Sequence, residues 1–183
     1  MMGGVRQAGV VLVFVMNFVR AFGIMSSVVA APVAAAVAVD SDAARLAAGL
    51  DAHAARDYDT ARGRLRPLAD RGSAIAETLL GVMAAKGEGV KADPAAAVGW
   101  WLRAANRGYA PAQLALAKAL AAGRGVAPDA GTAWVWARLA AGAGNGTRAE
   151  ASALAERLGR GFSAARLAEL EGKRASWRPW PGA

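Results

Sequence analysis

The sequence predicts an all-α protein built from stacked pairs of helices, and two observations carry this prediction. Alanine, which has the highest intrinsic helix propensity, is the most frequent residue, and strand-favouring residues are concentrated in the first forty positions. Residues 76–108 also match residues 112–144 at an offset of 36, with twelve identical positions. A repeat of this length is typical of units that stack on one another rather than close around a single core.

The first 38 residues predict a secretory signal peptide. Residues 8–38 contain one charge, Arg20, and end at positions 36–38 in Ala-Val-Ala, which has the small–any–small spacing that signal peptidase reads. Cysteine is absent, so this is not the signal of a lipoprotein. We therefore expect a periplasmic or secreted protein whose mature chain begins near Val39.

The sequence leaves open where this leader starts and whether it is removed. Counted from Met1 it is longer than usual, whereas a start at Met16 gives a short basic beginning followed by an apolar core. A buried helix and a membrane anchor are the alternatives, but Arg20 and the helix breakers Gly23 and Pro32 argue against a continuous spanning helix. Contact with a membrane is therefore expected only if the leader is retained.

Two similar glycine loops divide the repeat into helices. Residues 87–93 read Gly-Glu-Gly-Val-Lys-Ala-Asp, and residues 123–129 read Gly-Arg-Gly-Val-Ala-Pro-Asp. The first glycine can end a helix in the left-handed conformation, Val90 can turn into the groove between helices, and the aspartate can cap the next helix. A phosphate-binding loop would follow a strand and carry a lysine before serine or threonine, which neither loop does. We interpret both loops as joints, the first of them between helices over 74–86 and 94–107.

The predicted repeat domain covers residues 39–177. It is divided into three units and a terminal pair, at about residues 43–72, 73–108, 109–144 and 147–177. The first unit is shorter because it lacks the glycine loop. Helices over 147–159 and 163–177 form the terminal pair, and its polar surface would keep an open stack soluble. An irregular tail, 178–183, follows because its two prolines cannot continue a helix.

At these positions the sequence resembles the Sel-1-like repeat family, a branch of the tetratricopeptide-type helical repeats. The second unit supplies the family pattern at Leu80-Gly81, Gly87, Gly89, Val90, Asp93, Ala97, Trp100, Ala104-Ala105 and Gly108. The third supplies it at Leu116, Gly123, Gly125, Val126, Asp129, Ala133, Trp136, Ala140-Ala141 and Gly144. The usual aromatic residue before the loop is replaced by Ala84 and Leu120, which implies a thinner aromatic layer. The resemblance implies a right-handed superhelical stack of antiparallel helix pairs.

The resemblance also implies a scaffold or adaptor that binds a protein or peptide through a concave groove lined by the first helix of each pair. By analogy with that fold, the partner-binding residues would include Thr78, Val82, Lys86, Gln113, Leu114 and Lys118. The partner itself is not named by any motif.

No motif predicts an enzyme, a cofactor or a metal site. The chain has no cysteine and a single histidine, His53, so neither a metal set nor a nucleophile–base set can be completed. We expect His53 to have a surface or capping role. The tryptophans of the second helices are expected to pack between units, whereas Trp177 and Trp180 would fold back over the last helix pair or contact a partner.

Two alternative functions remain. Some cysteine-rich members of the family are described as β-lactam-binding or hydrolysing proteins, but this chain has neither the cysteines nor a Ser-x-x-Lys motif. The formal charge of +8 would suit an anionic lipid surface or nucleic acid. The basic residues are scattered among acids, however, so we interpret them as a solvated face and do not expect nucleic acid as the partner.

Overall fold

The computed structural model describes residues 41–143 and 146–180. Within these ranges it contains eight helices and no strand, which confirms the all-α prediction. The helices are α3 (Asp42–Ala54), α4 (Tyr58–Asp70), α5 (Ala74–Lys86), α6 (Pro94–Asn106), α7 (Ala110–Ala122), α8 (Ala130–Gly142), α9 (Arg148–Gly159) and α10 (Ala164–Ser176). The predicted leader, 1–38, and the last three residues of the tail lie outside the described residues.

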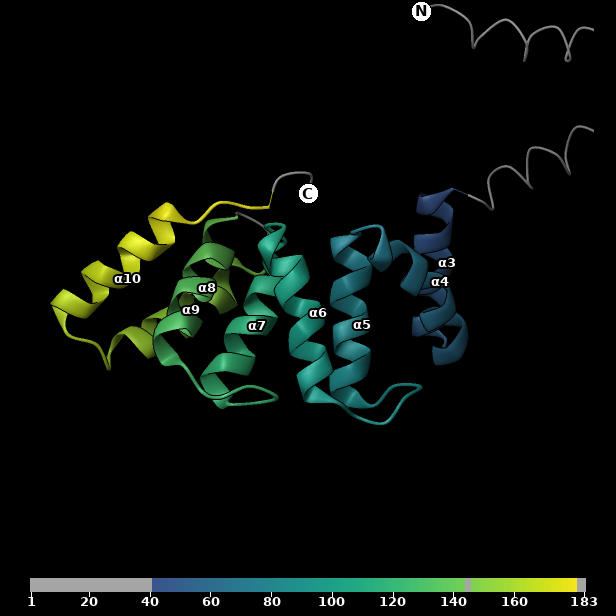
Figure 1. The fold of residues 1–183 in the computed structure, drawn as a ribbon, viewed down its shortest axis with the longest axis horizontal. Coiled ribbons are helices and arrows are strands. Elements are labelled where there is room, and N and C mark those ends of the chain that lie inside the picture. The colour runs from purple at the N-terminus through teal and green to yellow at the C-terminus, as the bar shows by residue number, and fades with distance from the viewer. Residues whose placement is uncertain (1–40, 144–145, 181–183) are drawn as a thin grey trace, which may run out of the picture. The chain divides into compact units, whose positions relative to one another are not determined.

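Residues from 45 onward form one compact unit, in which helices pack mainly on their neighbours in the sequence (Figure 1). Helix α5 packs on α6, α7 on α8, and α6 joins these two pairs by packing on α7. Both α9 and α10 pack on α8. The larger buried core runs from α6 to α10, and a smaller one lies between α4 and α5.

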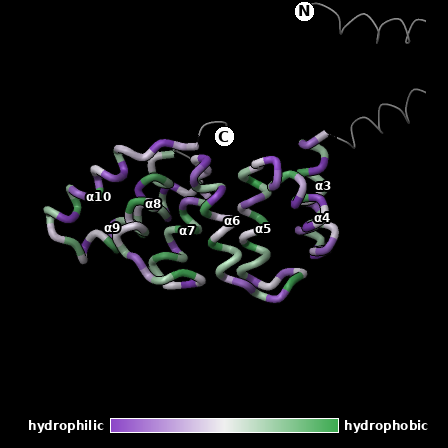
Figure 2. The backbone as a smooth tube through the Cα atoms, viewed as in Figure 1, coloured by the Kyte–Doolittle hydropathy of each residue, from purple (hydrophilic) through white to green (hydrophobic). Residues whose placement is uncertain are grey.

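Small side chains at repeated positions let the helices approach closely. Ala76, Ala97 and Ala104 are fully buried, and so are their counterparts 36 residues later, which are Ala112, Ala133 and Ala140. Figure 2 shows the hydrophobic residues concentrated in α5 to α8, whereas α10 is largely hydrophilic. Alanine therefore serves both as helix former and as the interface residue of this stack.

Both glycine joints have the predicted conformation. Gly87 and Gly123 end their helices in the left-handed region, with φ of 74° and 65°. The side chain of Asp93 accepts a hydrogen bond of 2.9 Å from the amide of Ala96, and Asp129 accepts one of 2.9 Å from Thr132. The joints are therefore local turns that stop one helix and start the next.

One detail of the joint prediction is wrong. Val90 does not turn into the groove between helices, because its side chain is 42% exposed. Its counterpart Val126 is partly buried against the larger core. The first pair uses a different joint, in which the non-glycine residue Arg56 takes the left-handed conformation, with φ of 63°.

The cap at Asp129 should stabilise the protein less in acid than at neutral pH. Hydrogen bonds from the Thr132 side chain and amide lower the pKa of Asp129 below its ordinary value of 3.8. The stabilisation by the ionised cap is therefore present above that value and is lost as the pH falls through the lower folded pKa. Asp129→Ala should lower the free energy of unfolding by about 1 kcal/mol at neutral pH, whereas Asp129→Asn, which keeps an acceptor, should lower it by much less. Urea denaturation measures both, and equal losses for the two variants would contradict the cap assignment.

The C-terminal tail packs against the middle of the unit rather than only over the last helix pair. The backbone amide of Trp180 donates a hydrogen bond of 2.8 Å to the carbonyl of Asn106, at the end of α6. Trp177 meets Trp136 of α8 edge to face, with ring centroids 6.0 Å apart. These contacts lie on the second helices of earlier pairs, and contact of the two tryptophans with a partner stays a prediction.

Candidate functional site: an exposed stripe, a buried carboxylate and a basic groove

The six residues predicted to bind a partner do not lie on one accessible face. Thr78 and Val82 of α5 are partly accessible, and Lys86 is exposed. Gln113 and Leu114 of α7 are only 2% and 4% exposed, so their assignment to an open groove is wrong. The Gln113 side chain instead donates a hydrogen bond of 3.2 Å to the carbonyl of Ala105.

The accessible face of the first helices follows a regular stripe. In α5 it consists of Ile75, Leu79, Val82 and Lys86, and in α7 of Pro111, Ala115, Lys118 and Ala122. The two sets are separated by the repeat length of 36, and each has the spacing of one helix face. We call these eight residues the first-helix stripe. The repeat could have revealed this stripe in the sequence, because Lys118 occupies the same position in its unit as Val82 does in the preceding one.

Lys118 also links neighbouring first helices. Its ammonium group lies 2.6 Å from the carboxylate of Glu150 on α9, and both side chains are about half exposed. An exposed pair of this kind contributes about 1 kcal/mol or less. Lys118 can therefore exchange this contact for one with a partner at small cost.

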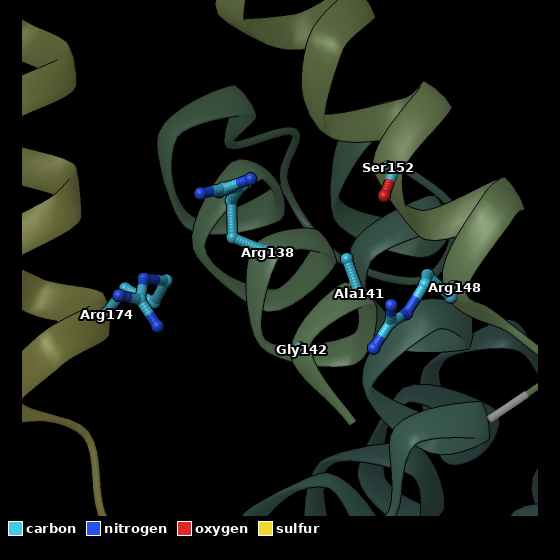
Figure 3. A pocket seen from close by; sticks show the side chains of 6 residues that line it. All are labelled: Arg138, Ala141, Gly142, Arg148, Ser152 and Arg174. Carbon is cyan, nitrogen blue, oxygen red and sulfur yellow. The ribbon is translucent and has the colours of Figure 1, made fainter. Parts of the chain in front are cut away.

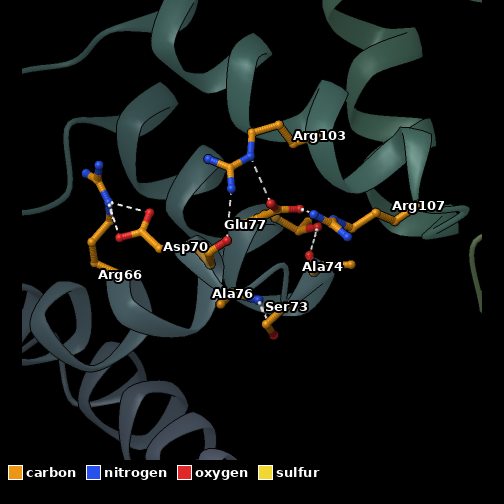
Figure 4. Close-up of polar contacts among 10 residues, drawn as sticks. Arg66, Asp70, Ser73, Ala74, Ala76, Glu77, Arg103 and Arg107 are labelled. Atoms are coloured by element: carbon orange, nitrogen blue, oxygen red, sulfur yellow. Dashed lines mark hydrogen bonds and ion pairs between the residues drawn. The ribbon is translucent and has the colours of Figure 1, made fainter. Parts of the chain in front are cut away.

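A buried carboxylate, which the sequence reasoning missed, lies between α5 and α6. Glu77 is fully buried, and its two oxygens lie 2.9 Å from Nε of Arg103 and 3.5 Å from Nε of Arg107 (Figure 4). Neither oxygen has a well-aligned hydrogen bond among the described residues. Burial outweighs the two arginine charges and raises the pKa of the Glu77 carboxyl above its ordinary 4.5.

Arg103 connects this carboxylate to the first pair. Its guanidinium donates a hydrogen bond of 2.9 Å to the carbonyl of Ala69 in α4 and lies over the ring of Trp100, 4.8 Å from its centroid. The counterpart of Glu77 in the next unit is Gln113, which is also buried. A polar residue at the same repeat position in both units is the signal that could have revealed this interface in the sequence.

His53 contacts the first glycine joint. Its Nε2 lies 2.8 Å from the carboxylate of Glu88 in the first glycine joint. In the described residues no group of histidine, cysteine, aspartate or glutamate side chains could hold a metal ion. Nothing in this arrangement provides a nucleophile next to a base.

A groove in the C-terminal half gathers three arginines from three helices. Figure 3 shows Arg138 on α8, Arg148 on α9 and Arg174 on α10. These side chains line a hollow with a volume of about 290 Å³. Ala141, Gly142 and Ser152 complete its lining. We call this hollow the arginine end of the groove.

Comparisons with known proteins agree with this architecture. The family model described as the Sel1 repeat matches residues 74–109 and 110–145. A solved Sel1 repeat protein from Oxalobacter formigenes is 30% identical, with a TM-score of 0.57, and the match covers 64% of this chain and 89% of that one. This chain belongs to the Sel1-repeat family. Sel1 repeats form helical scaffold folds that generally are not catalytic and typically bind protein partners.

A longer Sel1-type structure shows the same fold. It is a protective antigen present in uropathogenic Escherichia coli strains, displaying an SLR fold, and matches with a TM-score of 0.69 at 23% identity. The match covers 76% of this Sel1-repeat chain but 31% of the antigen, so the chain spans about a third of the antigen's length. None of the curated proteins is similar enough to the sequence to count as a match.

Proposed function

We propose that this Sel1-repeat protein is an exported scaffold that binds a protein or peptide segment on the first-helix stripe. The observation that carries the proposal is the recurrence of the stripe, because the same four positions of α5 and α7 are accessible 36 residues apart. Because the two rows recur with the repeat, a partner can make equivalent contacts with both of them. Apolar residues such as Ile75, which is 40% exposed, provide contact area, and the two lysines favour an acidic or polar rim on the partner.

The proposed export rests on the leader. Residues 1–38 have the composition of a secretory signal and contain no acid. In the described ranges, none of the helices combines the length and the apolar character that a membrane span requires. We infer that the mature protein acts in the periplasm or outside the cell.

Crosslinking in intact cells tests the proposed function. Tagged protein is recovered from the cell envelope with its crosslinked partners, and its own N-terminus is sequenced. We expect a start near Val39 and a defined partner that is captured several-fold less by Lys86→Ala/Lys118→Ala. The matched control, Lys91→Ala/Arg124→Ala, removes two exposed charges from the glycine joints and should capture the partner like the wild type.

The stripe assignment would be wrong if both double variants captured the same partner as the wild type in the same amount. It would also be wrong if the stripe variant had lost its fold. Thermal unfolding followed by circular dichroism checks this, and we expect a loss of about 1 kcal/mol or less, because both lysine side chains are exposed and Glu88, the more buried partner of Lys86, keeps its contact with His53.

A further inference from the structure

The groove of the C-terminal half is built by the way the last helices pack. Helices α9 and α10 both pack on α8, and residues of all three helices line a furrow. The arginine end is continued by a second hollow of about 250 Å³, and the two share Arg138 and Ser152 as lining residues. The furrow is therefore long enough to hold more than a single small ion.

The arginine end has more positive than negative charge. Glu171 is the acid at this end, and it lies 2.6 Å from Nη2 of Arg174 and 4.0 Å from Nε of Arg138. Arg148 forms no ion pair with any described residue, and nearby Glu150 is paired with Lys118. The arginine end thus has three guanidinium groups and one carboxylate, which contacts two of them, and guanidinium groups bind carboxylates in a planar, two-pronged manner.

The opposite end of the groove is mainly apolar. Trp134 and Leu167 line it together with Ala155 and Gly159, and Arg138 stacks over the Trp134 ring at 5.6 Å. Glu156 adds one negative charge at this end. A second acidic group of a ligand would be repelled here, whereas an apolar side chain would gain contact with Trp134.

We propose that this groove binds an acidic peptide segment, with carboxylates at the arginine end and an apolar side chain against Trp134 and Leu167. The proposal rests on the proposed function as a protein-binding scaffold, and it assigns a chemical class of partner to a second surface, separate from the first-helix stripe. A free phosphate or a nucleic acid would use only the arginine end, and Glu156 would oppose a longer polyanion. The combination of charge and apolar lining therefore favours a peptide.

Fluorescence anisotropy with a defined probe tests this inference on the purified mature protein. The probe is a short fluorescein-labelled peptide in which a leucine is followed by two glutamates. Arg148→Glu should weaken its binding by about tenfold, because the variant places an acid where a carboxylate is expected. The control Arg124→Glu makes the same charge change in the exposed second joint and should bind the probe like the wild type.

The fold of Arg148→Glu is expected to survive the substitution. Position 148 is exposed and is the first residue of α9, where a negative charge is favourable to the helix dipole. The two peptide controls replace the glutamates by glutamine or the leucine by serine, and both should bind more weakly. Each result in this direction supports the peptide assignment.

Equal binding of the probe to the wild type and Arg148→Glu would overturn the inference. So would a serine peptide that binds as tightly as the leucine peptide, which would indicate a simple anion site. The stripe variant Lys86→Ala/Lys118→Ala should bind the probe normally. If the probe fails to bind while the wild type still captures its partner through the stripe, the groove proposal fails and the proposed function stands.

Discussion

Replacing Gly125 by alanine should destabilise the protein by about 3 kcal/mol, more than any other substitution in the glycine joints. Gly125 has φ of 73°, and a Cβ atom built on it would lie 2.2 Å from the backbone oxygen of Pro94. The atom that the new Cβ would clash with belongs to the backbone at the start of α6. Removing this clash therefore requires a shift of the helix rather than of the end of a flexible side chain. Chemical denaturation followed by circular dichroism measures the loss.

Gly123→Ala is the matched control for this prediction. Gly123 is two residues away and also has positive φ, but a Cβ there would meet only the ring of Pro128, at 3.3 Å. We expect a loss of about 1 kcal/mol from the left-handed conformation alone. Equal losses for the two variants would show that the contact between Gly125 and Pro94 does not matter for stability.

Arg103→Ala should lower the free energy of unfolding by about 3 kcal/mol at neutral pH, because it leaves the buried Glu77 carboxylate with Arg107 as its one remaining partner. The same substitution in a Glu77→Gln background should cost about 1 kcal/mol, since no buried charge is then left behind. A double-mutant cycle by urea denaturation measures the difference. Arg66→Ala is the control, because Arg66 also lies over the ring of Trp100 but pairs with Asp70 on the surface.

The loss in Arg103→Ala should shrink as the solution is acidified. The pKa of Glu77 is raised above 4.5 by burial in the wild type, and removing an arginine raises it further. A carboxyl with a raised folded pKa contributes most favourably below its unfolded value and becomes unfavourable as the pH rises through the folded value. A loss that was identical in both backgrounds and at every pH would show that the pair contributes nothing.

The fold could be predicted from the sequence because the features that define it are local and occur in both repeats. The caps at Asp93 and Asp129 act within three residues, and the left-handed glycines at 87 and 123 end helices through their own backbone. Such features depend on neighbours along the chain. The repeat of 36 residues then predicted where the units lie in the sequence, without information on the contacts between them.

The candidate site could be predicted only in part, because the sequence did not show which side of each first helix faces outward. Val82 and Lys118 occupy the same repeat position, and both are accessible as expected. Gln113 looked like a surface residue, but the carbonyl of Ala105 at the end of the preceding helix gives its amide a buried partner. A polar side chain can thus be buried when the packing of the helices gives it a hydrogen-bond partner.

The sequence by itself determined the helices, their joints and their period, since these follow from backbone propensities and from contacts within one turn. Only the tertiary structure decided which contacts each repeat makes with the next one. The second glycine of each joint rests on the first residue of an earlier second helix, Gly89 against Tyr58 and Gly125 against Pro94. The Glu77 interface and the basic groove likewise join residues from different helices, and their geometry depends on how those helices pack, which no local pattern encodes.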